Sequence, residues 1–158
     1  MDARKLLNAE YSAAVFCKIA GMDQRIWTNQ IQAGNIRVDR RAENSGEKNI
    51  MTGLTGIRAL IFASLAETMR YKQAGRIAWA REPENEKAME AMIEKAIDRI
   101  GTGEDVVCFE IDPLNWTATP ILNRFQALEH HNASFMLAVK INITSCVKAV
   151  LEGIQTLQ

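Results

Sequence analysis

The 158-residue sequence has only three cysteines and no long apolar run. An odd number of widely separated cysteines, Cys17, Cys108 and Cys146, fits neither a disulfide framework nor a zinc site. We therefore expect reduced thiols in the core. No run approaches the roughly 20 apolar residues of a membrane-spanning helix, and residues 1–9 lack the apolar stretch of a signal peptide. These absences predict a cytoplasmic protein without a membrane partner.

Patterns that carry catalysis or cofactor binding are absent as well. The sequence has no Gly-rich phosphate loop, no His-Glu-x-x-His pattern and no serine or cysteine with an identifiable general base. Its two histidines, His130 and His131, are adjacent, so on a helix they would point in different directions, without a ligand at metal-binding spacing. We therefore expect a protein that is not an enzyme and that binds neither a metal nor a cofactor.

The charges are divided unevenly along a chain of ordinary globular composition. Hydrophobic residues make up 47% of it and charged residues 24%, and 19 basic side chains balance 19 acidic ones. However, residues 1–81 carry 13 basic and 7 acidic side chains, whereas residues 82–158 carry 6 basic and 12 acidic ones. This asymmetry indicates that the first segment contacts a nucleic acid and the second contacts protein or itself.

Capping residues and a glycine divide the start of the basic segment into two short helices. Ser12 is suited to begin a helix that ends near Ile19. Residues 20–22 contain Gly21, which suits a left-handed turn conformation. Asp23 can then begin a second helix over residues 24–33. The pattern predicts two helices joined by a tight turn.

The second of these helices has one apolar and one polar face. We expect Ile26, Trp27 and Ile31 to face the core. Hydrogen-bonding side chains recur at helical spacing on the other face: Arg25, Thr28, Asn29 and Gln32. Four such side chains along one exposed stripe are suited to contact the edges of DNA bases.

The residues that follow alternate between apolar and polar as in a β-hairpin. We expect strands over residues 36–40 and 48–51, joined by a turn at residues 43–46. If this segment binds DNA, four basic side chains of the hairpin are expected to hold phosphates: Arg37, Arg40, Arg41 and Lys48. Thr52 or Thr55 can begin the next helix, which is predicted to reach about Arg70, and a shorter helix is predicted within residues 74–80.

The acidic segment is predicted to contain helices and strands. The expected elements are a helix that begins after Pro83 and ends before Gly101, a strand over residues 106–111, a helix opened by Thr119-Pro120 and reaching His130, a strand over residues 135–141, and a last helix capped by Thr144. Two strands make a poor sheet alone, so we expect a further strand or pairing across a dimer. The apolar stripe of the last helix also favours a homodimer.

The stretch Phe16-Cys17-Lys18-Ile19-Ala20-Gly21-Met22-Asp23 resembles the Val-Ala-Lys-Leu-Ala-Gly-Val-Ser run of the MerR-type winged helix-turn-helix family. In that family a glycine also ends the recognition helix at the interval that separates Asp23 from Gly34. The resemblance covers residues 11–70 and implies a DNA-binding domain whose second helix enters the major groove. Thr28-Asn29-Gln30-Ile31 stands where the family commonly has Arg-Tyr-Trp-Glu, so base preference does not carry over.

Together these patterns predict an α+β protein: an N-terminal winged helix-turn-helix in residues 1–81, followed by a small acidic C-terminal α/β domain in residues 82–158 that dimerises or binds a partner. The expected function is a sequence-specific regulator of transcription that binds double-stranded DNA, of phage or prophage type. Two alternatives remain open. One is a DNA-packaging or recombination accessory protein similar to a terminase small subunit or an excisionase. The other is a protein-interaction module that has lost DNA binding.

Overall fold

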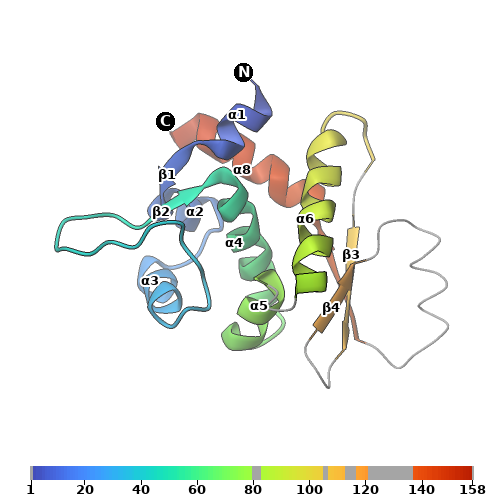
Figure 1. Ribbon diagram of the computed structural model, residues 1–158, viewed down its shortest axis with the longest axis horizontal. Coiled ribbons are helices and arrows are strands. Elements are labelled where there is room, and N and C mark those ends of the chain that lie inside the picture. Colours follow the sequence, from blue (N-terminus) through green and yellow to red (C-terminus); the bar gives the residue numbers. More distant parts are fainter. Residues whose placement is uncertain (1, 80–82, 105–106, 113–116, 121–136, 158) are drawn as a thin grey trace.

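The computed structural model describes residues 2–79, 83–104, 107–112, 117–120 and 137–157 (Figure 1). These residues form a mixed α and β fold in which helices predominate. Strands β1 (Glu10–Ser12) and β2 (Ile50–Thr52) form one antiparallel sheet, and β3 (Val107–Asp112), β4 (Thr117–Pro120) and β5 (Leu137–Asn142) form a second sheet with the order β4-β3-β5. The two sheets lie at opposite sides of the molecule. Each helix in the described ranges is too short or too polar to traverse a bilayer.

The two predicted helices near the N-terminus are confirmed. Helix α2 (Ala13–Ile19) begins at Ser12, whose hydroxyl accepts a hydrogen bond from the backbone N–H of Ala14 at 3.4 Å. Helix α3 (Gln24–Gln32) begins at Asp23, whose carboxylate accepts two backbone N–H groups of the first turn of α3 at 2.9 and 3.1 Å. Because these caps act within three residues, they are readable from the sequence.

The hairpin predicted at residues 36–51 is wrong as a pair of strands. Only Arg40 pairs with Ile50, as an isolated bridge, and β2 pairs instead with β1, which lies near the N-terminus, after the short helix α1 (Ala3–Asn8). Ile36 is fully buried and Val38 packs against the core. The apolar side chains whose alternation predicted a strand therefore anchor a loop by packing against the core. They do not belong to a continuous ladder of backbone hydrogen bonds between two strands.

The helices after this loop have different bounds from those predicted. Helix α4 (Gly53–Ala66) begins at Thr52, as expected, because the Thr52 hydroxyl accepts the Thr55 N–H at 3.2 Å. It ends at Ala66 and not near Arg70. Helix α5 (Tyr71–Ala78) begins earlier than predicted, because the Gln73 side chain accepts the Arg70 backbone N–H at 3.2 Å and fixes the first turn.

The further strand expected in the acidic segment is β4. Thr119 pairs with Glu110 of β3, so the prediction that Thr119-Pro120 begins a helix is wrong. The helix predicted to reach His130, and both histidines, lie outside the described residues. Since the third strand comes from the same chain, the sheet does not need a second copy to complete it.

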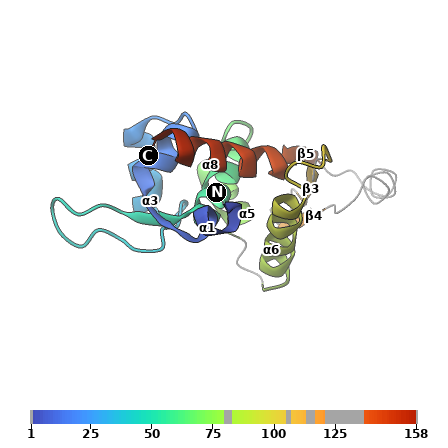
Figure 2. The ribbon, with the colours of Figure 1, turned by 90° about the horizontal axis from the view of Figure 1, so that it is seen from above.

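The last helix, α8 (Ile143–Leu157), is buried along its apolar stripe. Its cap is Asn142 and not Thr144, because the Asn142 side-chain oxygen accepts the backbone N–H of Ser145 at 2.9 Å, while Thr144 is 1% exposed. Figure 2 shows α8 extending across the N-terminal helices, and it packs against α1, α2, α4 and the helix α6 (Pro83–Asp98). The incomplete sheet and the apolar stripe of the last helix were the two reasons to expect a homodimer, and this chain itself supplies the third strand and covers the stripe. The homodimer stays a prediction.

Residues from both sides of position 81 share one hydrophobic core. The buried apolar side chains of the described residues form a single cluster that runs from Leu6 to Ile154. Helices α2 and α8 approach closely at Gly153, where an added Cβ would lie 2.4 Å from the Ile19 side chain. Helix α8 therefore packs as part of the N-terminal helical layer, although it belongs to the segment that was expected to form a separate domain.

Acidic residues of α6 pair with arginines of the basic segment. Arg4 lies 3.0 Å from Glu94 and 2.9 Å from Asp98, and Arg58, whose side chain is 13% exposed, lies 3.6 Å from Glu90. The three acidic residues follow one another at intervals of four, which places them on one face of α6. Part of the charge asymmetry of the sequence is therefore neutralised inside the molecule.

Candidate nucleic-acid interface

Helix α3 presents its polar side chains to solvent. Arg25, Asn29 and Gln32 are exposed, while Thr28 is half-buried and its hydroxyl donates a hydrogen bond to the Gln24 carbonyl at 2.9 Å. On the opposite face Trp27 and Ile31 are 1% and 4% exposed. Figure 1 shows α3 at the edge of the molecule, away from the acidic helix α6 and the sheet β4-β3-β5. The helix is therefore held by its apolar face and leaves its polar stripe open.

Ile26 does not face the core, and its predicted burial is wrong. Its side chain is 37% exposed, one of the few large apolar side chains in the described residues with that much exposure. The reason is the helical period: Ile26 lies about 100° from Trp27 around the axis, outside the arc that packs against the core. An exposed apolar side chain thus stands beside Arg25 and Asn29.

Two of the three acidic side chains of the loop at residues 37–49 are used within the fold. The Asp39 carboxylate accepts the Thr52 backbone N–H at 2.6 Å and the Thr55 hydroxyl at 3.0 Å. The Glu47 carboxylate accepts the Asn44 side-chain amide at 3.0 Å and the Glu43 backbone N–H at 2.9 Å. These hydrogen bonds lower the pKa of Glu47, and the one from the Asn44 side chain has the largest effect. Both carboxylates therefore hold the loop in shape.

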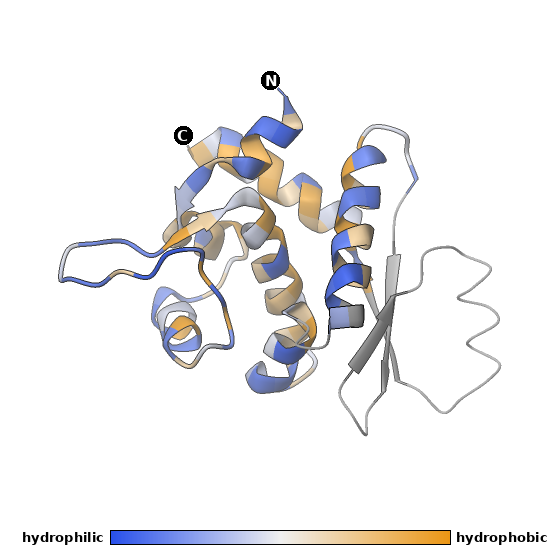
Figure 3. Ribbon diagram, viewed as in Figure 1, coloured by the Kyte–Doolittle hydropathy of each residue, from blue (hydrophilic) through white to orange (hydrophobic). Residues whose placement is uncertain are grey.

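The four basic residues predicted to hold phosphates lie in the same loop but have different surroundings. Arg37 and Lys48 are exposed and make no ion pair within the described residues. Arg40 lies 3.3 Å from Glu10, and Arg41 donates to the Ile31 carbonyl at the end of α3 at 3.2 Å. The loop projects from the molecule beside α3, and Figure 3 shows it hydrophilic over most of its length.

Two basic residues that the sequence reading missed lie on α5. Lys72 and Arg76 are exposed and line a hollow of about 340 Å³ together with Arg37 and the residues directly after α3. Of the two, only Arg76 falls in the helix predicted within residues 74–80, whereas α5 begins at Tyr71 and includes both. Their spacing of four could therefore be recognised as one helix face only once the true start of α5 was known. What could not be read was that α5 packs against the loop that follows α3.

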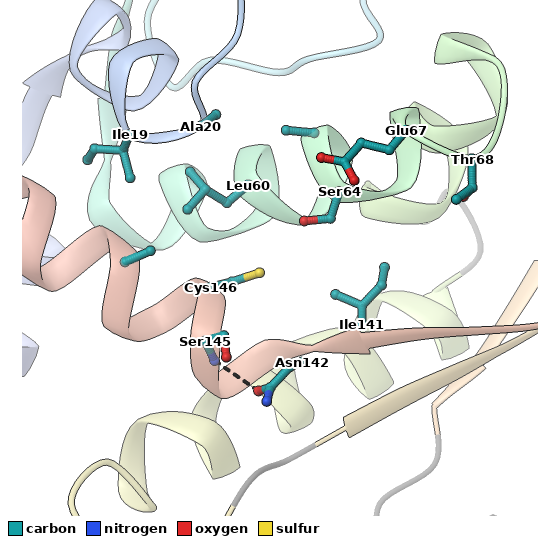
Figure 4. Close-up of a pocket in the computed structure, with 12 residues that line it drawn as sticks. Ile19, Ala20, Leu60, Ser64, Glu67, Thr68, Ile141, Asn142, Ser145 and Cys146 are labelled. Atoms are coloured by element: carbon teal, nitrogen blue, oxygen red, sulfur yellow. Dashed lines mark hydrogen bonds between the residues drawn. The ribbon is translucent and has the colours of Figure 1, made fainter.

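A second hollow lies between α2, α4, β5 and α8 (Figure 4). It has a volume of about 450 Å³, with Leu60 and Ile141 among its apolar lining residues and Ser64 and Glu67 among its polar ones. Burial raises the pKa of the Cys146 thiol, which also lines it, to about 11. The thiol therefore stays protonated at neutral pH, and the hollow does not offer a thiolate nucleophile.

The raised pKa of Cys146 predicts a loss of stability at alkaline pH. The unfolded chain releases this proton near pH 9 and the folded chain near pH 11, so the stabilisation is complete below pH 9 and is lost as pH rises through 11. Between pH 8 and pH 11 the unfolding free energy should fall about 2 kcal/mol further in the wild type than in Cys146→Ala. Urea unfolding across this range measures the difference, and parallel curves for the two proteins would contradict the prediction.

The part of the chain that the structure describes gathers no group of three metal-ligating side chains. No protein-family model matches the chain, and no curated protein is significantly similar to it. Within the described residues, α3, the loop at residues 37–49 and α5 together form a surface with exposed polar and basic side chains.

Proposed function

We propose that the protein binds double-stranded DNA through a winged helix-turn-helix and acts as a sequence-specific regulator of transcription. In this proposal α2 braces α3, α3 enters the major groove, and the loop at residues 37–49 serves as the wing. The main support is the position of α3: its polar stripe is open to solvent, remote from the acidic helix α6, and bordered by exposed basic side chains.

The exposed face of α3 offers the chemistry that base recognition requires. An arginine such as Arg25 can donate two hydrogen bonds to guanine, and an asparagine such as Asn29 can pair with adenine. Ile26 adds an apolar contact suited to the methyl group of thymine. Thr28 can contribute only in part, since its hydroxyl donates to the Gln24 carbonyl and is left as an acceptor. Gln32 completes the stripe one turn further along.

The basic side chains around α3 are suited to phosphates, which carry no sequence information but set the affinity. Arg37 and Lys48 are available for such contacts as they stand. Arg40 would have to leave Glu10, an exposed ion pair that contributes little to stability. Arg41 holds the loop to the end of α3 through one guanidinium nitrogen, and its remaining N–H groups can still donate to a phosphate.

The proposal is tested by selecting bound duplexes from a random pool and measuring the affinity for them against salt concentration. A steep fall of affinity with salt and an enriched sequence are expected, because bound phosphates release counterions and bases are read. An affinity that is independent of salt would overturn the proposal and favour a protein-interaction module. Rings or filaments on DNA, without an enriched sequence, would favour a packaging or recombination accessory protein.

Asn29→Ala should weaken binding to the selected sequence by about 1–3 kcal/mol and leave binding to unrelated duplexes unchanged, because a lost base contact affects specificity alone. Fluorescence anisotropy with both duplexes measures the two affinities. Asn8→Ala is the matched control, since Asn8 is an exposed asparagine at the end of α1, away from α3. Equal losses on both duplexes would exclude Asn29 from base reading.

A further inference from the structure

The hollow beside α3 collects positive charge from three basic side chains. Arg37, Lys72 and Arg76 line it, and none of its lining residues in the described part of the chain is acidic. All three side chains are exposed, and none of them makes an ion pair within the described residues. The hollow therefore differs from the arginine sites at Arg4 and Arg58, which are occupied by carboxylates of α6.

The position of these charges is fixed by close backbone packing. Gly75 of α5 lies against the chain that leaves α3, and an added Cβ there would stand 2.6 Å from the Asn35 carbonyl oxygen. The Asn35 side chain donates to the Gln30 side chain at 2.8 Å, which ties this stretch back to α3. Lys72 and Arg76, on either side of Gly75 along α5, are thereby brought next to the end of α3.

The arrangement is unfavourable for the free protein. Lys72 and Arg76 are four residues apart on one face of α5, and like charges at this spacing destabilise a helix. Arg37 adds a third positive charge from the neighbouring loop. An anion that enters the hollow relieves this repulsion and meets up to three charged donors, which is the chemistry that phosphate groups prefer.

We propose that Lys72, Arg76 and Arg37 form a phosphate-binding site that holds a backbone phosphate of the duplex beside the groove read by α3. This assignment rests on the proposed function. The DNA backbone is the source favoured by position, because the hollow begins at Ala33 and Gly34, immediately after the last turn of α3. The site extends the DNA contact surface to the side of α3 formed by α5.

The test compares two charge-matched double variants by fluorescence anisotropy over a range of salt concentrations. Lys72→Gln/Arg76→Gln removes two charges from the hollow, and Lys87→Gln/Lys148→Gln removes two exposed charges from α6 and α8. The first variant should bind every duplex more weakly, and its logarithmic salt slope should be smaller by about 1–2, as expected for two lost phosphate contacts. The second should retain the wild-type slope.

Failure of this site and failure of DNA binding give different results. If the wild type binds DNA and Lys72→Gln/Arg76→Gln binds it equally well with an unchanged slope, the site is refuted and the proposed function stands. If the wild type does not bind DNA, the thermal unfolding midpoint is measured with and without added pyrophosphate. A midpoint that pyrophosphate raises in the wild type but not in Lys72→Gln/Arg76→Gln would show a phosphate site whose ligand is a free phosphate compound. Equal changes of the midpoint in the two proteins would refute the site.

Discussion

Trp27→Ala should destabilise the protein by about 3–5 kcal/mol, the usual cost of removing a large buried aromatic side chain. Trp27 is 1% exposed and is the largest fully buried side chain in the described residues, on the face of α3 that packs against the core. Without the indole ring, Ile31 is the buried side chain of α3 that remains to hold the helix against the core. Urea unfolding measures the loss of stability, and the dependence of the unfolding free energy on urea concentration is expected to stay unchanged.

The neighbouring residue provides the control for this prediction. Ile26 lies on the same helix but is 37% exposed, so Ile26→Ala should change the unfolding free energy by less than about 1 kcal/mol. Trp27→Phe should cost less than Trp27→Ala, because the ring stays and the indole Nε1 makes no hydrogen bond within the described residues. Equal effects of Trp27→Ala and Ile26→Ala would mean that α3 is not anchored through Trp27.

Gly56→Ala should destabilise the protein by about 3 kcal/mol, at the upper end of the range for overpacked cores. An added Cβ at Gly56 of α4 would lie 2.1 Å from the ring of Phe16 in α2. Phe16 is fully buried and meets Tyr11 edge-to-face at a centroid distance of 5.9 Å, so its ring has no open space to enter. The penalty outweighs the roughly 1 kcal/mol that alanine gains over glycine in a helix.

Two further variants separate this collision from a general effect of the substitution. Gly153→Ala, also in a helix, should be far milder, because the side chain of Ile19 that it meets is only half-buried and can move. Phe16→Leu should rescue Gly56→Ala in part, giving a coupling free energy of about 1 kcal/mol or more between the two sites. Additive effects would show that the Phe16 ring is not the obstacle.

The starts of three helices were readable from the sequence. Ser12, Asp23 and Thr52 begin α2, α3 and α4 where their side chains suggested, because a cap acts on backbone groups within three residues. The polar stripe of α3 was readable for the same reason, since the helical period alone places Arg25 and Asn29 on one face. The misplaced Ile26 shows the limit of that period: it gives the direction of a side chain but not the width of the buried arc.

Contacts between distant segments could not be read in this way. Strands β1 and β2 are three residues each and pair across about forty residues of chain, so neither has enough alternation to be recognised. The sequence likewise showed an excess of acid after residue 81, but only the folded molecule brings Glu90 to Arg58 and Glu94 to Arg4. A charge count cannot distinguish a surface that awaits a partner from one already paired.

The sequence by itself determined the starts of α2, α3 and α4 and the residues that α3 presents, because caps and periodicity depend on neighbours along the chain. It did not reveal α1, and it placed the start of α5 too late. Only the tertiary structure decided that α5 lies against the end of α3 and that Lys72 and Arg76 join Arg37 around one hollow. That position follows from the close approach of Gly75 to the Asn35 backbone. Such an approach depends on how whole helices pack, which no local pattern specifies.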